Sequence, residues 1–227
     1  MVHAVSGKWS FRRRSGASLA ALAVVLLLGS CAEREAYETA LETNSIPAFR
    51  GYVQAYPDGK FVDEAYDRME ELYFQSCLAK GTPEGVDLYL KEYPNGNFLA
   101  EAEKARVRLA YEAASEVDTP EAYKAFLNEF PEGNLAGDAR ARMEMLSYRE
   151  ASRTNDSAAF EVYLLQFPDG RHAEEARAAI VRLAYLNAAG EDSIQAYEQF
   201  LETYADSRYA IGARARLTHL RLQEQAN

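Results

Sequence analysis

The sequence contains few of the residues that usually carry catalysis or hold metal ions. Its 227 residues include two cysteines, three histidines and one tryptophan. The histidines lie far apart in the sequence, and no G-x-S-x-G, H-E-x-x-H, C-x-x-C or phosphate-binding glycine loop is present. We therefore expect a protein that is not an enzyme and that has no metal, no cofactor and no small-molecule substrate.

A hydrophobic run long enough to cross a bilayer is also missing. The N-terminal apolar stretch, residues 17–28, has twelve residues, fewer than the about 20 that a membrane helix needs. It follows four basic residues, and the sequence then reads Leu28-Gly29-Ser30-Cys31, which resembles the lipobox of bacterial lipoproteins. This resemblance implies a signal peptide over residues 1–30, lipid attachment at Cys31 and a short linker over residues 31–35. A plain signal peptide or a retained membrane helix is the alternative.

Basic residues are scarce relative to acidic ones. The chain has a net charge of −10, and residues 1–30 contain four basic and no acidic side chains. Their removal leaves 21 basic and 35 acidic side chains, a net charge of −14. Such a surface disfavours nucleic acids and anionic headgroups, so the membrane must be reached through the lipid. Ala32, not aspartate, follows Cys31, which by the same resemblance predicts the periplasmic face of a Gram-negative outer membrane.

The sequence does contain a 37-residue repeat. Prolines recur at this spacing, each with Tyr or Phe before it and glycine two residues after it: Pro57, Pro94, Pro131 and Pro168. When the repeats are aligned, alanine, aromatic residues and leucine recur in fixed columns, that is, at corresponding positions 37 residues apart. Such a pattern is typical of a stacked array. The five repeats occupy residues 36–72, 73–109, 110–146, 147–183 and 184–220, followed by a polar tail over residues 221–227.

Each repeat carries the pattern of one short and one long helix. One column holds residue types that cap helix N-termini: Ser45, Thr82, Thr119, Asp156 and Ser193. A helix of about eleven residues should run from each cap to the aromatic residue before the proline. After the glycine, apolar residues three and four apart predict a helix of roughly 18 residues that continues into the next repeat until a short polar turn. Neither helix can bury its apolar face alone, so we expect an all-α fold, an α-solenoid of stacked helix pairs.

One column of the long helices holds a row of arginines: Arg140, Arg177 and Arg214. Stacked repeats place such residues side by side, where they could bind acidic side chains or a carboxylate of a partner segment. A solvated edge of the array is the alternative.

Other polar residues are interpreted as structural. The pairs Glu70-Glu71 and Glu174-Glu175 are adjacent on a helix and are expected to be solvated. Cys77 stands in a column of alanines and His172 in a column of mostly aromatic residues, so both are interpreted as packing residues.

The string from Ala122 to Ala139, A-Y-x-x-F-L-x-x-F-P-E-G-x-x-A-x-x-A, resembles the tetratricopeptide-like repeats of envelope lipoproteins. The likeness is to the outer-membrane protein assembly lipoprotein family BamD and to the periplasmic repeat protein of the Tol-Pal system, and it covers residues 36–220. The period of 37, in place of 34, and Glu144 near the usual helix glycine are departures from that pattern.

This resemblance implies a right-handed α-solenoid of five tetratricopeptide-like repeats. It implies a lipid-anchored scaffold that binds envelope proteins or peptide segments, in outer-membrane protein assembly or a related complex. A module that binds peptidoglycan or exported proteins is the alternative.

Overall fold

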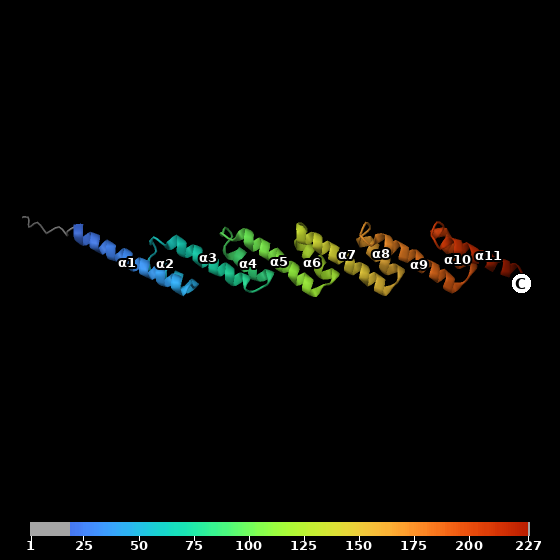
Figure 1. Ribbon diagram of the computed structural model, residues 1–227, viewed down its shortest axis with the longest axis horizontal. Helices are drawn as coiled ribbons and strands as arrows, with labels where there is room; N and C mark the ends of the chain where they lie inside the picture. Colours follow the sequence, from blue (N-terminus) through green and yellow to red (C-terminus); the bar gives the residue numbers. More distant parts are fainter. Residues whose placement is uncertain (1–18, 227) are drawn as a thin grey trace, which may run out of the picture. The chain divides into compact units, whose positions relative to one another are not determined.

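The computed structural model describes residues 19–226, with side chains from Cys31 onwards, and all regular structure in this part of the chain is α-helical. Figure 1 shows the helices in chain order. They are α1 Leu19–Thr43, α2 Ile46–Ala55, α3 Val62–Leu78, α4 Pro83–Glu92, α5 Leu99–Val117, α6 Pro120–Glu129, α7 Asn134–Thr154, α8 Ser157–Gln166, α9 Ala173–Glu191, α10 Ile194–Tyr204 and α11 Ala210–Ala226. The predicted all-α class is confirmed.

The chain divides into two compact units, one that ends at Glu103 and one from Lys104 on. In unit 1, α1 contacts α2, α2 contacts α3, and α3 contacts α4. In unit 2, each of α6 to α10 contacts the helix that follows it in the same way. Such packing between sequence neighbours is consistent with a helical repeat.

The short helices begin where the cap column predicts. Four cap side chains accept a hydrogen bond from the backbone N–H three residues on: Ser45, Thr82, Thr119 and Ser193. Asp156 occupies the same N-cap position without such a bond. In the short helices α2, α4, α6 and α8, the aromatic residue before the proline is the C-cap, as Tyr56 is for α2. The short helices have 10 or 11 residues, which confirms the prediction.

The long helices cross the boundaries between repeats, as predicted. From α3 to α11 they have 17 to 21 residues, and α7 runs through the boundary between Leu146 and Ser147. Two segments outside the predicted repeats are also helical. Residues 31–35, predicted as a short linker, belong to α1, and residues 221–226, predicted as a polar tail, continue α11. Both consist largely of Ala, Glu, Gln, Arg and Leu, which favour helix, and contain no residue that would end one.

Most of the predicted signal peptide lies outside the residues that can be described. Residues 1–18 are not described, and over residues 19–30 the backbone is helical and continuous with the rest of α1. Of the described helices, none combines the length and the apolar character needed to cross a membrane.

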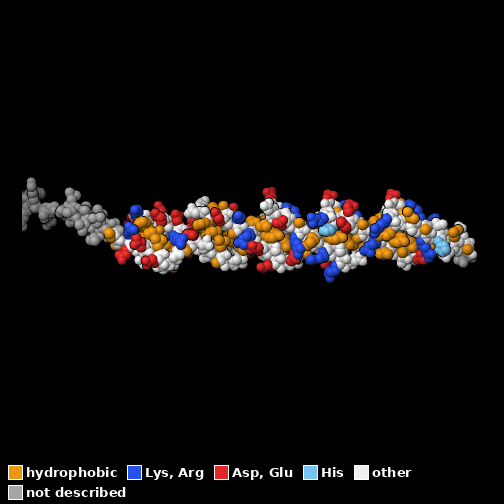
Figure 2. Space-filling model, in the orientation of Figure 1, with side chains coloured by type: hydrophobic (Ala, Val, Ile, Leu, Met, Phe, Trp, Pro, Cys, Tyr) orange, Lys and Arg blue, Asp and Glu red, His pale blue; other side chains and the backbone are white. Residues whose placement is uncertain are grey.

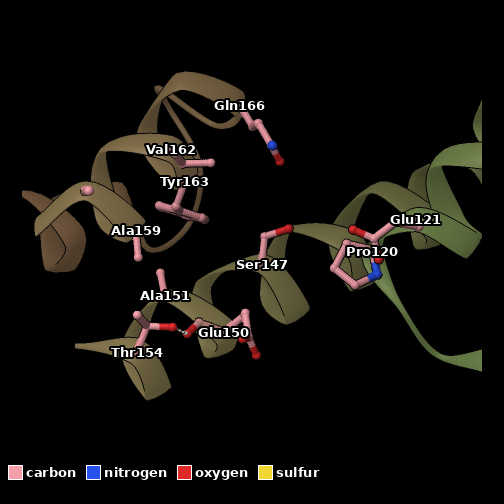
Figure 3. A pocket seen from close by; sticks show the side chains of 11 residues that line it. Pro120, Glu121, Ser147, Glu150, Ala151, Thr154, Ala159, Val162, Tyr163 and Gln166 are labelled. Atoms are coloured by element: carbon pink, nitrogen blue, oxygen red, sulfur yellow. Dashed lines mark hydrogen bonds between the residues drawn. The ribbon is translucent and has the colours of Figure 1, made fainter. Parts of the chain in front are cut away.

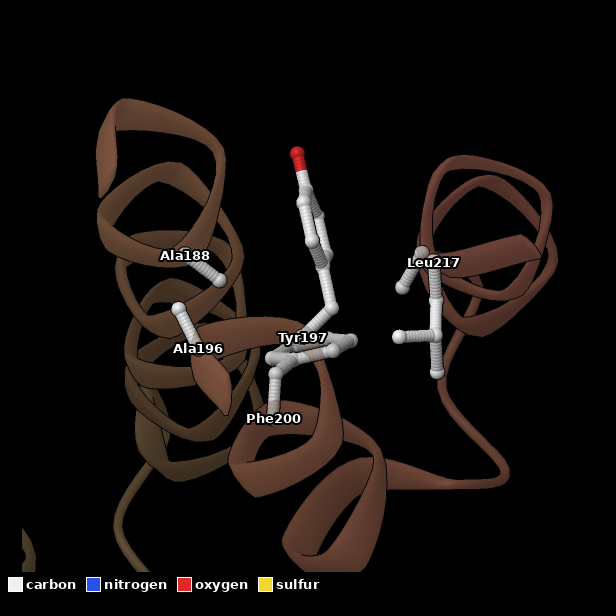
Figure 4. Close-up of a cluster of buried hydrophobic side chains, with 6 residues drawn as sticks. Ala188, Ala196, Tyr197, Phe200 and Leu217 are labelled. Atoms are coloured by element: carbon white, nitrogen blue, oxygen red, sulfur yellow. The ribbon is translucent and has the colours of Figure 1, made fainter. Parts of the chain in front are cut away.

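Neighbouring helices bury small clusters of alanine and aromatic side chains. In one cluster, Ala188 of α9 faces Ala196 of α10, and the rings of Tyr197 and Phe200 from α10 lie between α9 and Leu217 of α11 (Figure 4). Small side chains let the two backbones approach closely, and the rings fill the space beside them. The column of Ala188 is buried throughout: Ala40, Cys77, Ala114, Ala151 and Ala188. Cys77 is therefore a packing residue, as predicted.

A second column stacks rings between successive long helices. The stacked pairs are Tyr37 on Phe61 (4.7 Å between ring centroids), Phe74 on Phe98 (5.1 Å), Tyr148 on His172 (4.4 Å) and Tyr185 on Tyr209 (5.0 Å). The imidazole of His172 takes the place of a benzene ring in this series. The prediction that His172 is a packing residue is confirmed.

Candidate binding surface

A groove of about 380 Å³ lies between α6, α7 and α8 in unit 2. Ala151 of α7 and Ala159 of α8 point towards each other in it (Figure 3). Pro120 and Glu121 line it from the N-terminus of α6, and Val162 lines it from α8. The other lining residues are Ser147, Glu150, Thr154, Ala158, Tyr163 and Gln166.

The groove exists because the repeat places small side chains where α7 and α8 cross. Ala151 is buried in this contact, whereas Val162 and Leu165 on the outer side of α8 stay 56% and 85% exposed. These two residues are three apart and therefore neighbours on the helix surface. A shallow depression beside exposed aliphatic side chains is suited to apolar side chains of another protein.

The same construction recurs one period later. A groove of about 210 Å³ between α9 and α10 has eight lining residues: Ala184, Asn187, Ala188, Glu191, Ala196, Gln199, Phe200 and Tyr204. Seven of them lie 37 residues after a residue that lines the first groove. Ala188 and Ala196, for example, correspond to Ala151 and Ala159. Unit 2 therefore presents two related grooves on successive helix pairs.

Carboxylates lie around the apolar part of the first groove. The hydrogen bond from Arg153, at 2.7 Å, holds the pKa of the Glu150 carboxyl below its usual range. Glu121 adds a second carboxylate from α6. Apolar contacts next to acceptor groups suit a peptide segment that carries aliphatic side chains together with basic or N–H groups.

Acidic and basic side chains are interspersed on the face of the molecule that Figure 2 shows. Apolar side chains appear between them along the described helices. Several charges are paired within one helix, as are Arg108 with Glu112 and Arg153 with Glu150. A partner that meets this face encounters both signs, so its specificity has to come from particular residues.

The arginine row makes contacts within the chain. Each side chain donates to the backbone carbonyl nine residues earlier: Arg140 to Pro131, Arg177 to Pro168 at 2.7 Å and Arg214 to Ala205 at 2.9 Å. These carbonyls belong to the turn after a short helix, so the arginines tie that turn to the next long helix. The three residues are exposed, and each guanidinium has further N–H donors. Binding of a partner by this row stays a prediction.

Cys31 is exposed on α1, as a lipid attachment site must be. Glu33, two residues later, accepts hydrogen bonds from the Tyr52 hydroxyl at 3.0 Å and from the backbone N–H of Lys60 at 2.5 Å. The chain is therefore fixed to unit 1 almost directly after Cys31. Lipid attachment itself stays a prediction.

Glu33 belongs to a set of glutamate–tyrosine pairs that was not predicted from the sequence. The pairs are Glu33–Tyr52, Glu70–Tyr89 and Glu144–Tyr163, with oxygens 3.0, 2.6 and 2.9 Å apart. Each carboxylate also accepts a backbone N–H from the loop before the next long helix, as Glu70 does from Asn97 at 2.5 Å. Burial and the hydrogen bond to Glu70 raise the pKa of Tyr89 to about 12. Each pair thus joins two successive long helices through the short helix between them.

The prediction that Glu70 and Glu71 are both solvated is wrong for Glu70. Glu70 is only 7% exposed, whereas Glu71 stays near the surface beside Arg68. One pattern in the sequence indicates this burial. Two columns 19 residues apart change together from repeat to repeat, between glutamate with tyrosine and valine with phenylalanine. The columns read Glu33–Tyr52, Glu70–Tyr89, Val107–Phe126, Glu144–Tyr163 and Val181–Phe200. A buried carboxylate needs a donor, so both positions are polar or both are apolar. Glu174 and Glu175 are exposed, as predicted.

Comparison with known proteins identifies no family, because no protein-family model and no curated protein sequence matches the chain. Within residues 31–226, no group of three or more His, Cys, Asp or Glu side chains is placed to hold a metal ion. The features that bear on function are therefore the grooves of unit 2, the exposed Cys31 and the polar contacts that fix the helices.

Proposed function

We propose that the protein is a lipid-anchored scaffold that binds segments of partner proteins at the periplasmic face of the outer membrane, in outer-membrane protein assembly or a related envelope complex. Its five 37-residue repeats then form a right-handed α-solenoid of tetratricopeptide-like repeats. The observation that supports binding is the groove between α7 and α8 that recurs between α9 and α10. Successive grooves of one construction allow one segment to make the same contact twice.

The lipid anchor is supported by the sequence before Cys31 and by the exposure of that residue. The net charge of −14 on residues 31–227 disfavours contact with anionic headgroups, so membrane attachment depends on acyl chains. One acyl chain binds a membrane only marginally. The lipoproteins that the sequence resembles carry three.

Affinity purification from detergent-solubilised envelopes tests the binding role. The unchanged chain should recover a component of the β-barrel assembly machinery. A variant with Val162→Asp and Leu165→Asp should recover several-fold less, because it places charges beside the groove. Ile211→Asp is the matched control, since Ile211 is 79% exposed on α11 and lines neither groove. Recovery of peptidoglycan fragments alone contradicts the scaffold and supports the alternative.

Mass spectrometry of the mature N-terminus tests the anchor separately. The first residue should be Cys31, with a mass increase that corresponds to three acyl chains. Cys31→Ala should leave the precursor uncleaved at this position. A mature chain that begins at another residue, without acyl chains, contradicts the anchor and leaves the groove proposal intact.

A further inference from the structure

Unit 1 contains an aromatic pocket of about 540 Å³ between α2, α3 and α4. Tyr66 and Tyr73 of α3 line it together with Tyr93, which follows the last residue of α4. The ring centroids of Tyr73 and Tyr93 are 5.6 Å apart. The other lining residues are Ile46, Arg50, Val53, Gln54, Met69 and Glu92.

Two of the three tyrosines depart from the repeat. Tyr66 stands in the column that holds arginine in the last three repeats, and it is 55% exposed. Tyr73 stands in a column whose other members are Ala36, Ala110, Ser147 and Ala184. The other repeats pack without a ring at either position, so packing of the helices does not account for them. Both departures line the same pocket.

The next repeat shows which group this arrangement can hold. Arg106 occupies the column of Met69, and its guanidinium carbon lies 5.1 Å from the centre of the Phe130 ring. The same guanidinium forms an ion pair with Glu129. Glu129 and Phe130 correspond to Glu92 and Tyr93. The pocket in unit 1 therefore keeps the carboxylate and the ring that hold a guanidinium, while Met69 supplies no cation.

The later repeats do not keep this combination. Gln166 and Thr203 stand where Glu92 stands in the earlier repeat, so an aromatic ring follows but the carboxylate is missing. Within the pocket, Arg50 lies on the α2 side and Glu92 on the α4 side. The place for an added cation is thus the α4 side, beside Tyr93.

We propose that this pocket binds an arginine side chain of a partner protein, with the guanidinium over the Tyr93 ring and paired with Glu92. The inference rests on the proposed scaffold function and deepens it by naming the chemistry of a bound segment. A planar guanidinium combines stacking on a ring with hydrogen bonds to a carboxylate, as Arg106 does within the chain. The net charge of −14 after residue 30 favours a cationic segment over an acidic one.

Saturation-transfer NMR with short capped peptides tests the pocket in the full chain in detergent. One peptide carries a single arginine among glycines and serines, and the other carries citrulline, which has nearly the same shape and no charge. The arginine peptide should bind about tenfold more tightly. Glu92→Gln should reduce this preference about three- to tenfold, and Tyr66→Ala about threefold.

Met69→Arg provides the sharpest variant, because it places a cation of the chain itself in the pocket, as Arg106 does in the next repeat. It should abolish the preference for arginine. Because Met69 is 8% exposed, the Tm should fall, and circular dichroism checks that the chain stays helical at the temperature of the binding measurement. Met143→Arg is the matched control in the same column, where Gln166 replaces the carboxylate. This control should leave peptide binding unchanged.

Equal binding of the two peptides, or a preference that survives Met69→Arg, overturns the proposal. Free arginine amide that binds as tightly as the peptide also overturns it, since the pocket then serves a small cation. Failure of the scaffold function has a different signature. An arginine preference that persists while no envelope protein is recovered contradicts the scaffold and retains the cation pocket.

Discussion

The buried glutamate–tyrosine pairs show that one position in a repeat can be filled in two self-consistent ways. Glu70 and Tyr89 lose contact with water and gain a hydrogen bond to each other. One repeat later, Val107 and Phe126 occupy the same columns with apolar side chains. A mixture of the two leaves a buried polar group without a partner, which is costly.

Tyr89→Phe should therefore lower the free energy of unfolding by about 1–3 kcal/mol, because Glu70 stays buried and loses a donor. Adding Glu70→Val should recover part of this loss, since the double variant reproduces the pair Val107–Phe126. Urea denaturation followed by circular dichroism measures both. Phe126→Tyr is the reciprocal control and should destabilise, because it sets a hydroxyl against Val107. A double variant that is no more stable than Tyr89→Phe contradicts the coupling.

Alkaline pH should weaken the fold in a defined window. Burial, together with hydrogen bonds to glutamate, raises the pKa of Tyr89 and Tyr163 to about 12, compared with about 10 in an unfolded chain. A raised folded pKa contributes stability that is fully present below about pH 10 and is lost as the pH rises towards 12. The Tm should stay level up to about pH 10 and then fall. The variant Glu70→Val with Tyr89→Phe should fall less steeply.

Absorbance of the phenolate provides the check on this pH dependence. Tyr89 and Tyr163 should ionise only as the pH approaches 12, or on unfolding. Ionisation of all fifteen tyrosines near pH 10, with the helical signal intact, contradicts the assignment.

The role of a single residue could be predicted where its partner lies a few residues away in the sequence. The caps Ser45 and Thr82 act on the backbone three residues away, so residue type and position were sufficient. Glu70 was not predicted, because its partner is 19 residues away and both columns alternate between polar and apolar residues. The carbonyl contacts of the arginine row were missed for a related reason, since a backbone acceptor leaves no mark in the sequence.

At the scale of the helix, each of five helix ends has one residue in the left-handed region, with φ between 45° and 66°: Asn44, Gly81, Asp118, Asn155 and Asp192. These residues share one column, and glycine, asparagine and aspartate tolerate this conformation best. Some also contact the next long helix: Arg142 holds the pKa of the Asp118 carboxyl below its usual range, and Arg182 donates to Asn155 at 2.7 Å. The column thus ends one helix and attaches it to the next.

Gly81→Ala should isolate the conformational part of this role. No atom lies within 4 Å of the position that a Cβ would take, so the cost comes from the backbone and should be about 1–2 kcal/mol. Gly81→Asn should cost less, since asparagine occupies this column in two other repeats. Urea denaturation measures the difference.

Gly51→Ala is the control for that substitution. Gly51 lies inside α2 and also has open space around its Cβ position, so alanine there should stabilise by about 0.5–1 kcal/mol. Equal effects of alanine and asparagine at position 81 would show that the left-handed conformation is unimportant.

Helix bounds were predicted well where the sequence contains a cap, a proline or a glycine. They were missed at residues 31–35 and 221–226, where helix-forming residues continue without such a signal. In both places the helix extends beyond the stretch with apolar periodicity. This periodicity reflects the burial of one helix face, so an exposed helical segment does not show it.

For the whole molecule, the period predicts the order and type of the helices, because each repeat must match its neighbours. It does not predict the grooves or the aromatic pocket. The grooves arise where small side chains leave space, and the pocket arises where Tyr66 and Tyr73 depart from their columns. Residues that follow the repeat form the fold and the recurring grooves, whereas the aromatic pocket has to be sought among the departures from it.

Removal of one whole period should leave a foldable chain. Deleting residues 144–180 removes 37 residues and joins Met143 to Val181, so the first half of α7 continues directly as the second half of α9. The junction removes Glu144 together with its partner Tyr163 and retains the pair Val181–Phe200, so the buried contacts stay matched. Helicity per residue should be unchanged and unfolding cooperative, with a lower Tm because one helix pair is lost.

Deletion of residues 144–178 is the control that separates the period from mere shortening. It removes 35 residues and leaves Ala179 and Ile180 in the spliced helix, which turns everything after the junction by about 200°. The apolar columns of α9 and α10 then no longer line up with those of α6 and the first half of α7, and circular dichroism should show loss of helicity with a broad transition. Two deletions with equal stability would mean that the helices do not depend on matched columns, and the five-repeat arrangement would have to be abandoned.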